Sequence, residues 1–203
     1  MPNTAPFTEE QRDCLQELTN VAMGAAGESL AAFTKTFVNL SIPVVRAFHP
    51  SKISKGLAHV ETGENVSAVV QPFSLSEHEC FALVVITENS FSDLAQFTGR
   101  WVDNETVAGE LLGDLARTLN DTCLSGMSEM MDMTLDVEQP DVIALNIALD
   151  QLRLQDIAGW DSAISIEINY HLEDHPFNCD LLLLFPDQAL DDIRMILDGM
   201  INI

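Results

Sequence analysis

Apolar residues recur every three or four positions between Thr8 and Phe37, which is the period of an amphipathic helix. Thr8-Glu9-Glu10-Gln11 has the form of a capping box, so we expect a helix to begin there and to end near Lys35. The expected core face carries Leu15, Leu18, Ala22, Ala25 and Ser29. The expected solvent face carries Asp13, Glu17, Asn20 and Gly24, which at about 100° per residue fall within a narrow arc. The helix is therefore predicted to offer two carboxylates, a carboxamide and a glycine to another molecule.

The hydrophobic pattern changes to that of β-structure after this helix. Residues 38–48 alternate and predict a strand interrupted or bent at Pro43, and further strands are expected over 56–61 and 67–73. Residues 79–87 are nearly all apolar and predict a buried strand. A short amphipathic helix over 89–99 ends at a glycine.

The pattern then begins again about one hundred residues later. The second half predicts a long helix over 104–131, an extended segment over 134–145, a helical turn within 149–158, strands over 162–171 and 180–185, and a helix over 186–199. This recurrence indicates an internal duplication, with repeats over about 8–100 and about 103–203 within one domain. We expect an α/β fold of two pseudo-symmetric halves, with a largely antiparallel sheet packed against the two long helices.

Composition and charge narrow the class of protein. The 203 residues are 47% hydrophobic, which favours a folded core, and no apolar run is long enough to span a bilayer. We see no secretory leader and expect a cytoplasmic protein without membrane insertion. The net charge of −23 argues against nucleic-acid binding. The scattered cysteines are expected to be reduced, small apolar residues: Cys14, Cys80, Cys123 and Cys179.

The solvent face of the first helix matches a known spacing. Asp13-x3-Glu17-x2-Asn20, with Pro43 after twenty-two intervening residues, resembles the signature of the CheC/CheX/FliY phosphatases of bacterial chemotaxis. The chain length and the internal repeat are most similar to CheC. The resemblance implies a CheC-like fold and hydrolysis of the phospho-aspartate on a CheY-like response-regulator receiver.

The resemblance also implies roles for these residues. Asn20 would orient an in-line water, because an amide accepts a hydrogen bond through its oxygen and donates through its nitrogen. Glu17 would pair with a receiver lysine, and Asp13 would support docking at the edge. Gly24 costs helix stability and suggests close approach of the partner, whereas Pro43 would shape the strand beneath the helix. No cofactor or metal is expected on this chain, since Mg²⁺ would be held by the receiver.

The second long helix is predicted to carry a degenerate copy of this site. When Leu15–Asn20 is laid on Leu115–Asn120, Asn120 matches Asn20, Arg117 matches Glu17 and Gly113 matches Asp13. Arg117 would repel a receiver lysine, and Pro140 arrives three residues early. We therefore expect one working site, with Asn120 as a surface or helix-packing residue.

Several alternatives stay open at this level. The acidic stripe is also typical of a solvated helix face, of a non-catalytic receiver-binding module, or of a structural signalling subunit. A CheD-like deamidase partner and a homodimer are both compatible with the sequence. Residues 51–55 form the basic patch of the chain and favour a solvated loop. A set of possible metal ligands near a predicted hairpin favours an exposed turn: His171, Glu173, Asp174, His175 and Cys179.

Overall fold

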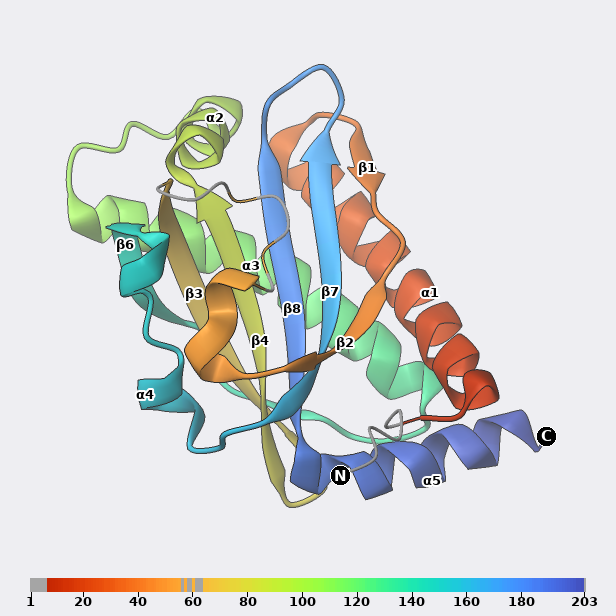
Figure 1. Ribbon diagram of the computed structural model, residues 1–203. Coiled ribbons are helices and arrows are strands. Elements are labelled where there is room, and N and C mark those ends of the chain that lie inside the picture. Colours follow the sequence, from red (N-terminus) through yellow and green to blue (C-terminus); the bar gives the residue numbers. More distant parts are fainter. Residues whose placement is uncertain (1–6, 56, 58–59, 61–63, 203) are drawn as a thin grey trace.

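The computed structural model describes residues 7–55, 57, 60 and 64–202 (Figure 1). Helix α1 spans Glu9–Thr34, and the predicted capping box is present at its start. The Gln11 backbone N–H donates to Thr8 Oγ1 at 3.2 Å, and the Thr8 N–H donates to Gln11 Oε1 at 3.0 Å. Lys35 ends the helix in the left-handed conformation, with φ of 57°. The predicted first helix is therefore confirmed.

The strands of the described residues form one antiparallel sheet. Its strands are β1 (Val38–Leu40), β2 (Val44–Phe48), β3 (Asn65–Leu75), β4 (His78–Thr87), β5 (Asp136–Val137), β6 (Asp141–Ala148), β7 (Ala163–Leu172) and β8 (Asn178–Pro186). The strand predicted over 38–48 is interrupted at Pro43, as expected. The strand predicted over 56–61 lies mostly outside the described residues, and its two described members, Leu57 and Val60, are not in a strand.

The strand order brings the two halves of the chain together in one sheet. The order is β1-β7-β8-β4-β3-β5, with β2 also paired to β7 and β6 also paired to β3. The central pair is β4 with β8, in which Leu83 lies opposite Leu182. Each half thus supplies the edge strands that pair with the other half.

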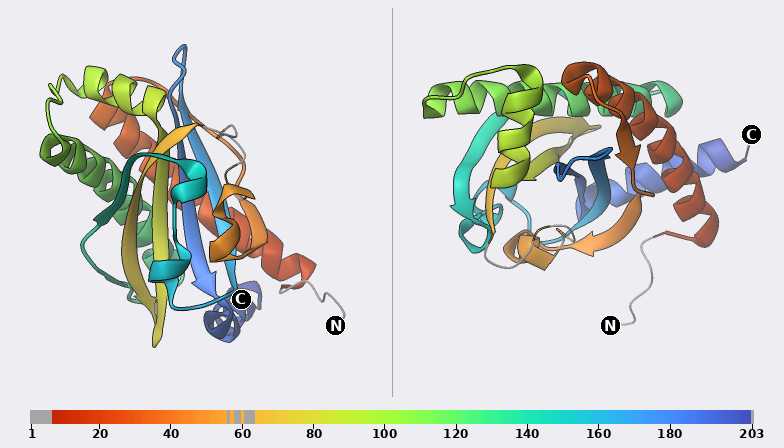
Figure 2. Two further views of the ribbon diagram at one scale, coloured as in Figure 1. Left: turned by 60° about the vertical axis from the view of Figure 1, so that its left-hand side comes forward. Right: turned by 90° about the horizontal axis from the view of Figure 1, so that it is seen from above.

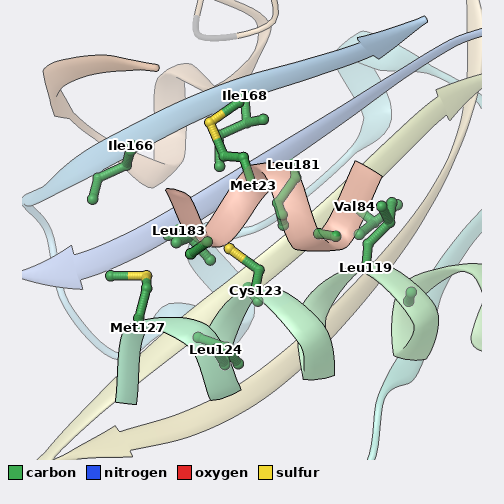
Figure 3. Packing of buried hydrophobic residues seen from close by; sticks show 14 of the residues in the cluster. Met23, Val84, Leu119, Cys123, Leu124, Met127, Ile166, Ile168, Leu181 and Leu183 are labelled. Carbon is green, nitrogen blue, oxygen red and sulfur yellow. The ribbon is translucent and has the colours of Figure 1, made fainter. Parts of the chain in front are cut away.

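Two long helices cover one face of this sheet. Helix α3 spans Glu105–Met130 and lies beside α1 (Figures 1 and 2). Side chains from both helices interdigitate with β4, β7 and β8, and Figure 3 shows Met23 and Cys123 at the centre of this core. The predicted packing of two long helices on one sheet is confirmed.

Shorter elements close the ends and the opposite face. Helix α2 (Glu88–Thr98) and helix α5 (Leu190–Ile201) lie at opposite ends of the sheet in Figure 1. The 3₁₀ helix η1 (Pro50–Lys55) and helix α4 (Gln155–Ala158) cover the other face, where a second apolar cluster includes Phe48 and Leu154. The 3₁₀ helices η2 (Leu149–Gln151) and η3 (Asp187–Ala189) complete the connections. None of the described helices is both long enough and apolar enough to span a membrane.

The pairing registers recur at a fixed distance along the chain. Leu40 pairs with Tyr170, and Phe73 pairs with Val137. Val137 lies 97 residues after Leu40 and Tyr170 lies 97 residues after Phe73, so the two pairs correspond with their partners exchanged between the halves. The same shift relates the pair Val44–Glu167 to the pair Asp141–Val70. The division into two repeats stays a prediction, but these registers supply a residue correspondence between the halves.

Candidate functional site

The polar stripe of α1 is exposed in the structure. Asp13, Glu17 and Asn20 are exposed, and Gly24 is partly exposed with open space where a Cβ would stand. The opposite face is buried through Leu15, Leu18 and Ala22, as expected.

The predicted core face was wrong at two positions. Ala25 is exposed and Ser29 is half-buried. The buried face lies further round the helix, where Met23 and Ala26 meet the sheet core, and Ser29 instead meets α3, with its Oγ 3.2 Å from Thr122 Oγ1.

The functional groups of the stripe are unengaged within the described part of the chain. There, the side chains of Asp13, Glu17 and Asn20 make no hydrogen bond and no ion pair with another residue. Their carboxylate and amide groups are solvated, so a partner would not have to break internal bonds to reach them.

Hydrogen bonds hold the strand segment beside the stripe against α1 and β7. Gln16 Nε2 donates to the Pro43 carbonyl at 3.2 Å, which fixes the break between β1 and β2 against α1. Ser41 is tied to β7, because its N–H donates to the Asn169 carbonyl and its Oγ accepts from the Asn169 N–H, each at 3.0 Å. Pro43 is itself buried in the break between β1 and β2, and the role implied for it stays a prediction.

The same segment locates Asn20 relative to the sheet edge. Gly27 faces Leu40, since a Cβ on Gly27 would lie 3.0 Å from Leu40 Cδ2. Gln16 faces Pro43, so the segment runs antiparallel to α1 between these two contacts. Asn20 lies between Gln16 and Gly27 along the helix, which places its amide beside the exposed residues that precede Pro43.

The burial pattern of α3 gives the counterpart of this site. Leu112, Leu115, Ala116 and Leu119 are buried on α3, as Leu15, Leu18, Thr19 and Ala22 are on α1. These sets are 97 residues apart, which is also the shift of the strand registers. At this shift the counterparts of Asp13, Glu17, Asn20, Gly24 and Pro43 are Glu110, Asp114, Arg117, Asp121 and Pro140.

This correspondence differs from the one predicted at a shift of one hundred. Arg117 occupies the place of Asn20 rather than that of Glu17, and Gly113 occupies the place of Gln16. Pro140 follows Arg117 after the same twenty-two residues that separate Asn20 from Pro43. The matching letters of Leu15–Asn20 and Leu115–Asn120 are therefore a misleading alignment.

Asn120 consequently has a different environment from Asn20. It is fully buried, and its Nδ2 donates to Gln71 Oε1 at 2.9 Å. Gln71 Nε2 in turn donates to Asp121 Oδ1 at 2.9 Å and to the Glu138 carbonyl at 3.0 Å. Asn120 is thus a packing residue between α3 and β3, and not a surface residue.

Charge is neutralised internally at the α3 counterpart. Asp114 accepts from Arg100 at 2.5 Å and from Arg117 at 3.4 Å. Both arginines line a pocket with Gly113 and Pro140. The carboxylate that corresponds to Glu17 is therefore already paired, and the amide that corresponds to Asn20 is missing.

The remaining candidate groups are accounted for by packing or exposure. Asp174 lies in a turn between β7 and β8, and the His175 ring packs edge-on against Phe97 with centroids 4.6 Å apart. Within the described ranges, no group of three or more His, Cys, Asp or Glu side chains is placed to hold a metal ion. The basic patch falls in η1, where Ser51 and Lys52 are exposed.

The cysteines are free and are mostly buried. Cys80, Cys123 and Cys179 are buried, whereas Cys14 is partly exposed. Burial raises the pKa of the Cys123 thiol to about 12, which keeps it protonated. These thiols therefore act as apolar core residues.

Comparison with known proteins identifies the fold. No family model matches the chain, and no curated protein matches it. Three solved structures illustrate the similarity. FliY from Thermotoga maritima has a TM-score of 0.72 and 16% identity, covering 95% of this chain and 98% of that one. The FliM middle domain from H. pylori has a TM-score of 0.60 and 11% identity, covering 94% and 99%. CheX from Desulfovibrio desulfuricans has a TM-score of 0.56 and 15% identity, covering 83% and 99%.

Proposed function

We propose that this protein, which has the fold shared by FliY, CheX and the FliM middle domain, is a response-regulator phosphatase with one site on α1. Its substrate would be the phospho-aspartate of a CheY-like receiver. The observation that carries the proposal is the state of Glu17 and Asn20, which are exposed and unengaged in the described structure, beside an edge fixed by Pro43.

The chemistry suits an amide on a rigid helix. Water attacks phosphorus in line with the scissile bond, the bond between phosphorus and the aspartyl oxygen breaks, and the products are inorganic phosphate and the receiver carboxylate. The Asn20 oxygen would accept a hydrogen bond from the water, while its nitrogen would donate to a phosphoryl oxygen. Positioning of this kind supplies much of the rate in phosphoryl transfer, and an amide removes no proton. Mg²⁺ would come with the receiver.

Glu17 would determine how the receiver docks. It lies three residues before Asn20 on the same exposed stripe, so a basic group paired with it is held one helical turn from the amide. Asp13 extends the negative stripe by another turn and would assist encounter with a basic surface.

The α3 counterpart supports a single site. Asp114 is engaged by Arg100 and Arg117, and Arg117 offers no group that could accept a hydrogen bond from water. We propose one receiver per chain. A CheD-like partner, a homodimer and a cytoplasmic location stay predictions.

The similarity to the FliM middle domain favours a second candidate function, which is a non-catalytic signalling or structural module. Such a module would use the same stripe to hold a partner. It differs from a phosphatase in one respect, because its bound receiver would lose phosphate at the receiver's own rate.

The test is the decay of phosphorylated receivers from the regulators encoded near this gene. The wild type should accelerate decay of at least one receiver. Asn20→Ala should slow the catalysed rate by about 10²-fold while binding persists, and Glu17→Lys should weaken binding by at least tenfold.

Matched surface changes provide the controls. Asn89→Ala removes an exposed amide from α2, and Glu129→Lys reverses an exposed charge on α3. Both variants should behave as the wild type does. If Asn20→Ala kept the full rate on a receiver that the wild type dephosphorylates, the catalytic role would be refuted, and binding without acceleration by the wild type would favour the second candidate.

A further inference from the structure

Exposed apolar side chains flank the polar stripe of α1 on both sides. We call Val21, Leu40, Ile42 and Val44 the apolar rim. Ile42, in the break between β1 and β2, is 78% exposed, and Val21, on α1, is 54% exposed. Large exposed apolar side chains that gather in one place are typical of interaction surfaces.

Helix geometry places the stripe between the two parts of the rim. Gln16 and Gly27 mark the side of α1 that faces the β1–β2 segment. Going round the helix from Gln16, Asn20 lies at about 40° and Val21 at about 140°. Asn20 is therefore next to the Ile42 side, and Val21 closes the far side of the stripe.

The rim is anchored by hydrogen bonds to β7. Ser41 exchanges two hydrogen bonds with Asn169 immediately before Ile42, and Val44 of β2 pairs with Glu167 of β7. Side chains on a fixed backbone lose less conformational entropy on binding than those on a mobile loop.

The second half of the chain provides an internal comparison. At the shift of 97, Val21, Ile42 and Val44 correspond to Thr118, Gln139 and Asp141, and only Leu40 keeps an apolar counterpart, Val137. The half that has Arg117 in place of the amide has thus also lost three of four rim residues. The scaffold tolerates polar residues at these positions, so the fold does not require the apolar ones. Their presence beside Asn20 needs another reason.

We propose that the apolar rim is part of the surface on which the phosphorylated receiver docks, with an apolar patch of the receiver seated against Ile42 and Val21 while a basic group meets Glu17. This inference rests on the proposed function. A second copy of this chain fits less well, because the rim borders Asp13 and Glu17 and each chain carries a net charge of −23.

The test exchanges rim residues for their counterparts. Val21→Thr with Ile42→Gln copies side chains that the second half already carries, so the variant should fold and keep its unfolding midpoint. On a receiver that the wild type dephosphorylates, KM should rise about tenfold or more while kcat stays within about twofold. Trp101→Gln, which removes a side chain 85% exposed between α2 and α3, should leave both constants unchanged.

The other possible outcomes separate failure of the rim's role from failure of the proposed function. An unchanged KM on that receiver overturns the rim's role and leaves the phosphatase proposal standing. A changed oligomeric mass by sedimentation with unchanged receiver kinetics also overturns it, since the rim then serves self-association. If the wild type acts on no receiver and binds none, the proposed function fails and the inference fails with it.

Discussion

Replacing Gly24 with alanine is expected to stabilise the protein. Gly24 lies inside α1, where glycine is less favourable than alanine by about 0.5–1 kcal/mol because it loses more backbone freedom on folding. A Cβ at Gly24 would have no atom of the described residues within 4 Å, so no contact among them offsets the gain. A gain of that size should raise the melting temperature by about 1–4 °C in a chain of this length.

The measurement is urea unfolding of the wild type, Gly24→Ala and Gly27→Ala. Gly27 is the matched control, because it lies on the same helix but its Cβ would stand 3.0 Å from Leu40 Cδ2. Leu40 would have to move, which should cancel part or all of the gain. A loss of stability in Gly24→Ala would refute the view that Gly24 faces open space, and equal gains in both variants would refute the close contact between Gly27 and Leu40.

A receiver-binding measurement tests whether Gly24 is needed for close approach of the partner. Gly24→Gln introduces a good helix former and fills the space one turn beyond Asn20. If the receiver approaches closely there, this variant should be as stable as the wild type or more so, yet should bind the receiver less tightly. Unchanged receiver affinity would show that Gly24 is not part of the docking surface.

Three further predictions concern the core, strand β7 and the α3 counterpart. Leu119→Ala should lower the unfolding free energy by about 2–5 kcal/mol, since Leu119 is fully buried between α3 and the sheet; a loss below about 1 kcal/mol in urea would contradict that packing. Burial raises the pKa of Glu167 above 4.5, although Ser165 and Arg46 oppose the shift, so the folded state holds this proton more tightly than the unfolded state does. Stability should therefore fall as pH rises from 4.5 through the folded pKa, and Glu167→Gln should flatten that decline in unfolding midpoints measured across it. Arg117→Asn should change stability by less than about 1 kcal/mol, because its ion pair is solvent-exposed, and a larger loss in the same denaturation assay would show that the pair is structural.

Local signals in the sequence predicted much of the fold. The capping box at Thr8 and Gln11 needs only neighbouring residues, so the start of α1 was predicted correctly. The buried strand over 79–87 was recognised because a strand covered on both faces is apolar throughout. The last helix was less well defined, since it continues past Gly199 to Ile201 and its first turn is the 3₁₀ helix η3.

Identical residues in an alignment of the two halves did not give the correspondence between them. Asn20 and Asn120 look equivalent in sequence, but one is exposed and the other is buried against Gln71. The shift of 97 follows from non-local strand pairing, in which β7 pairs with β1 and β2 of the first half as well as with β8, and β3 pairs with β5 and β6 of the second half as well as with β4. Those partners are set by tertiary packing, which a helical period alone does not specify.

The exposure of the site was predictable, whereas its surroundings were not. The arc formed by Asp13, Glu17 and Asn20 follows from helical geometry and was predicted. The apolar rim was missed, because Ile42 in an alternating segment looks like a residue that faces the core. Its exposure follows from the way Ser41 and Pro43 fix the edge of the sheet.

The central claim is that Asn20 positions the attacking water for a receiver's acyl phosphate. The most direct measurement is the single-turnover decay of a phosphorylated receiver with saturating wild type or Asn20→Ala, alongside an independent binding measurement. We expect a rate about 10²-fold slower for Asn20→Ala with nearly unchanged affinity. Equal rates for the two proteins on a receiver that the wild type dephosphorylates would contradict it.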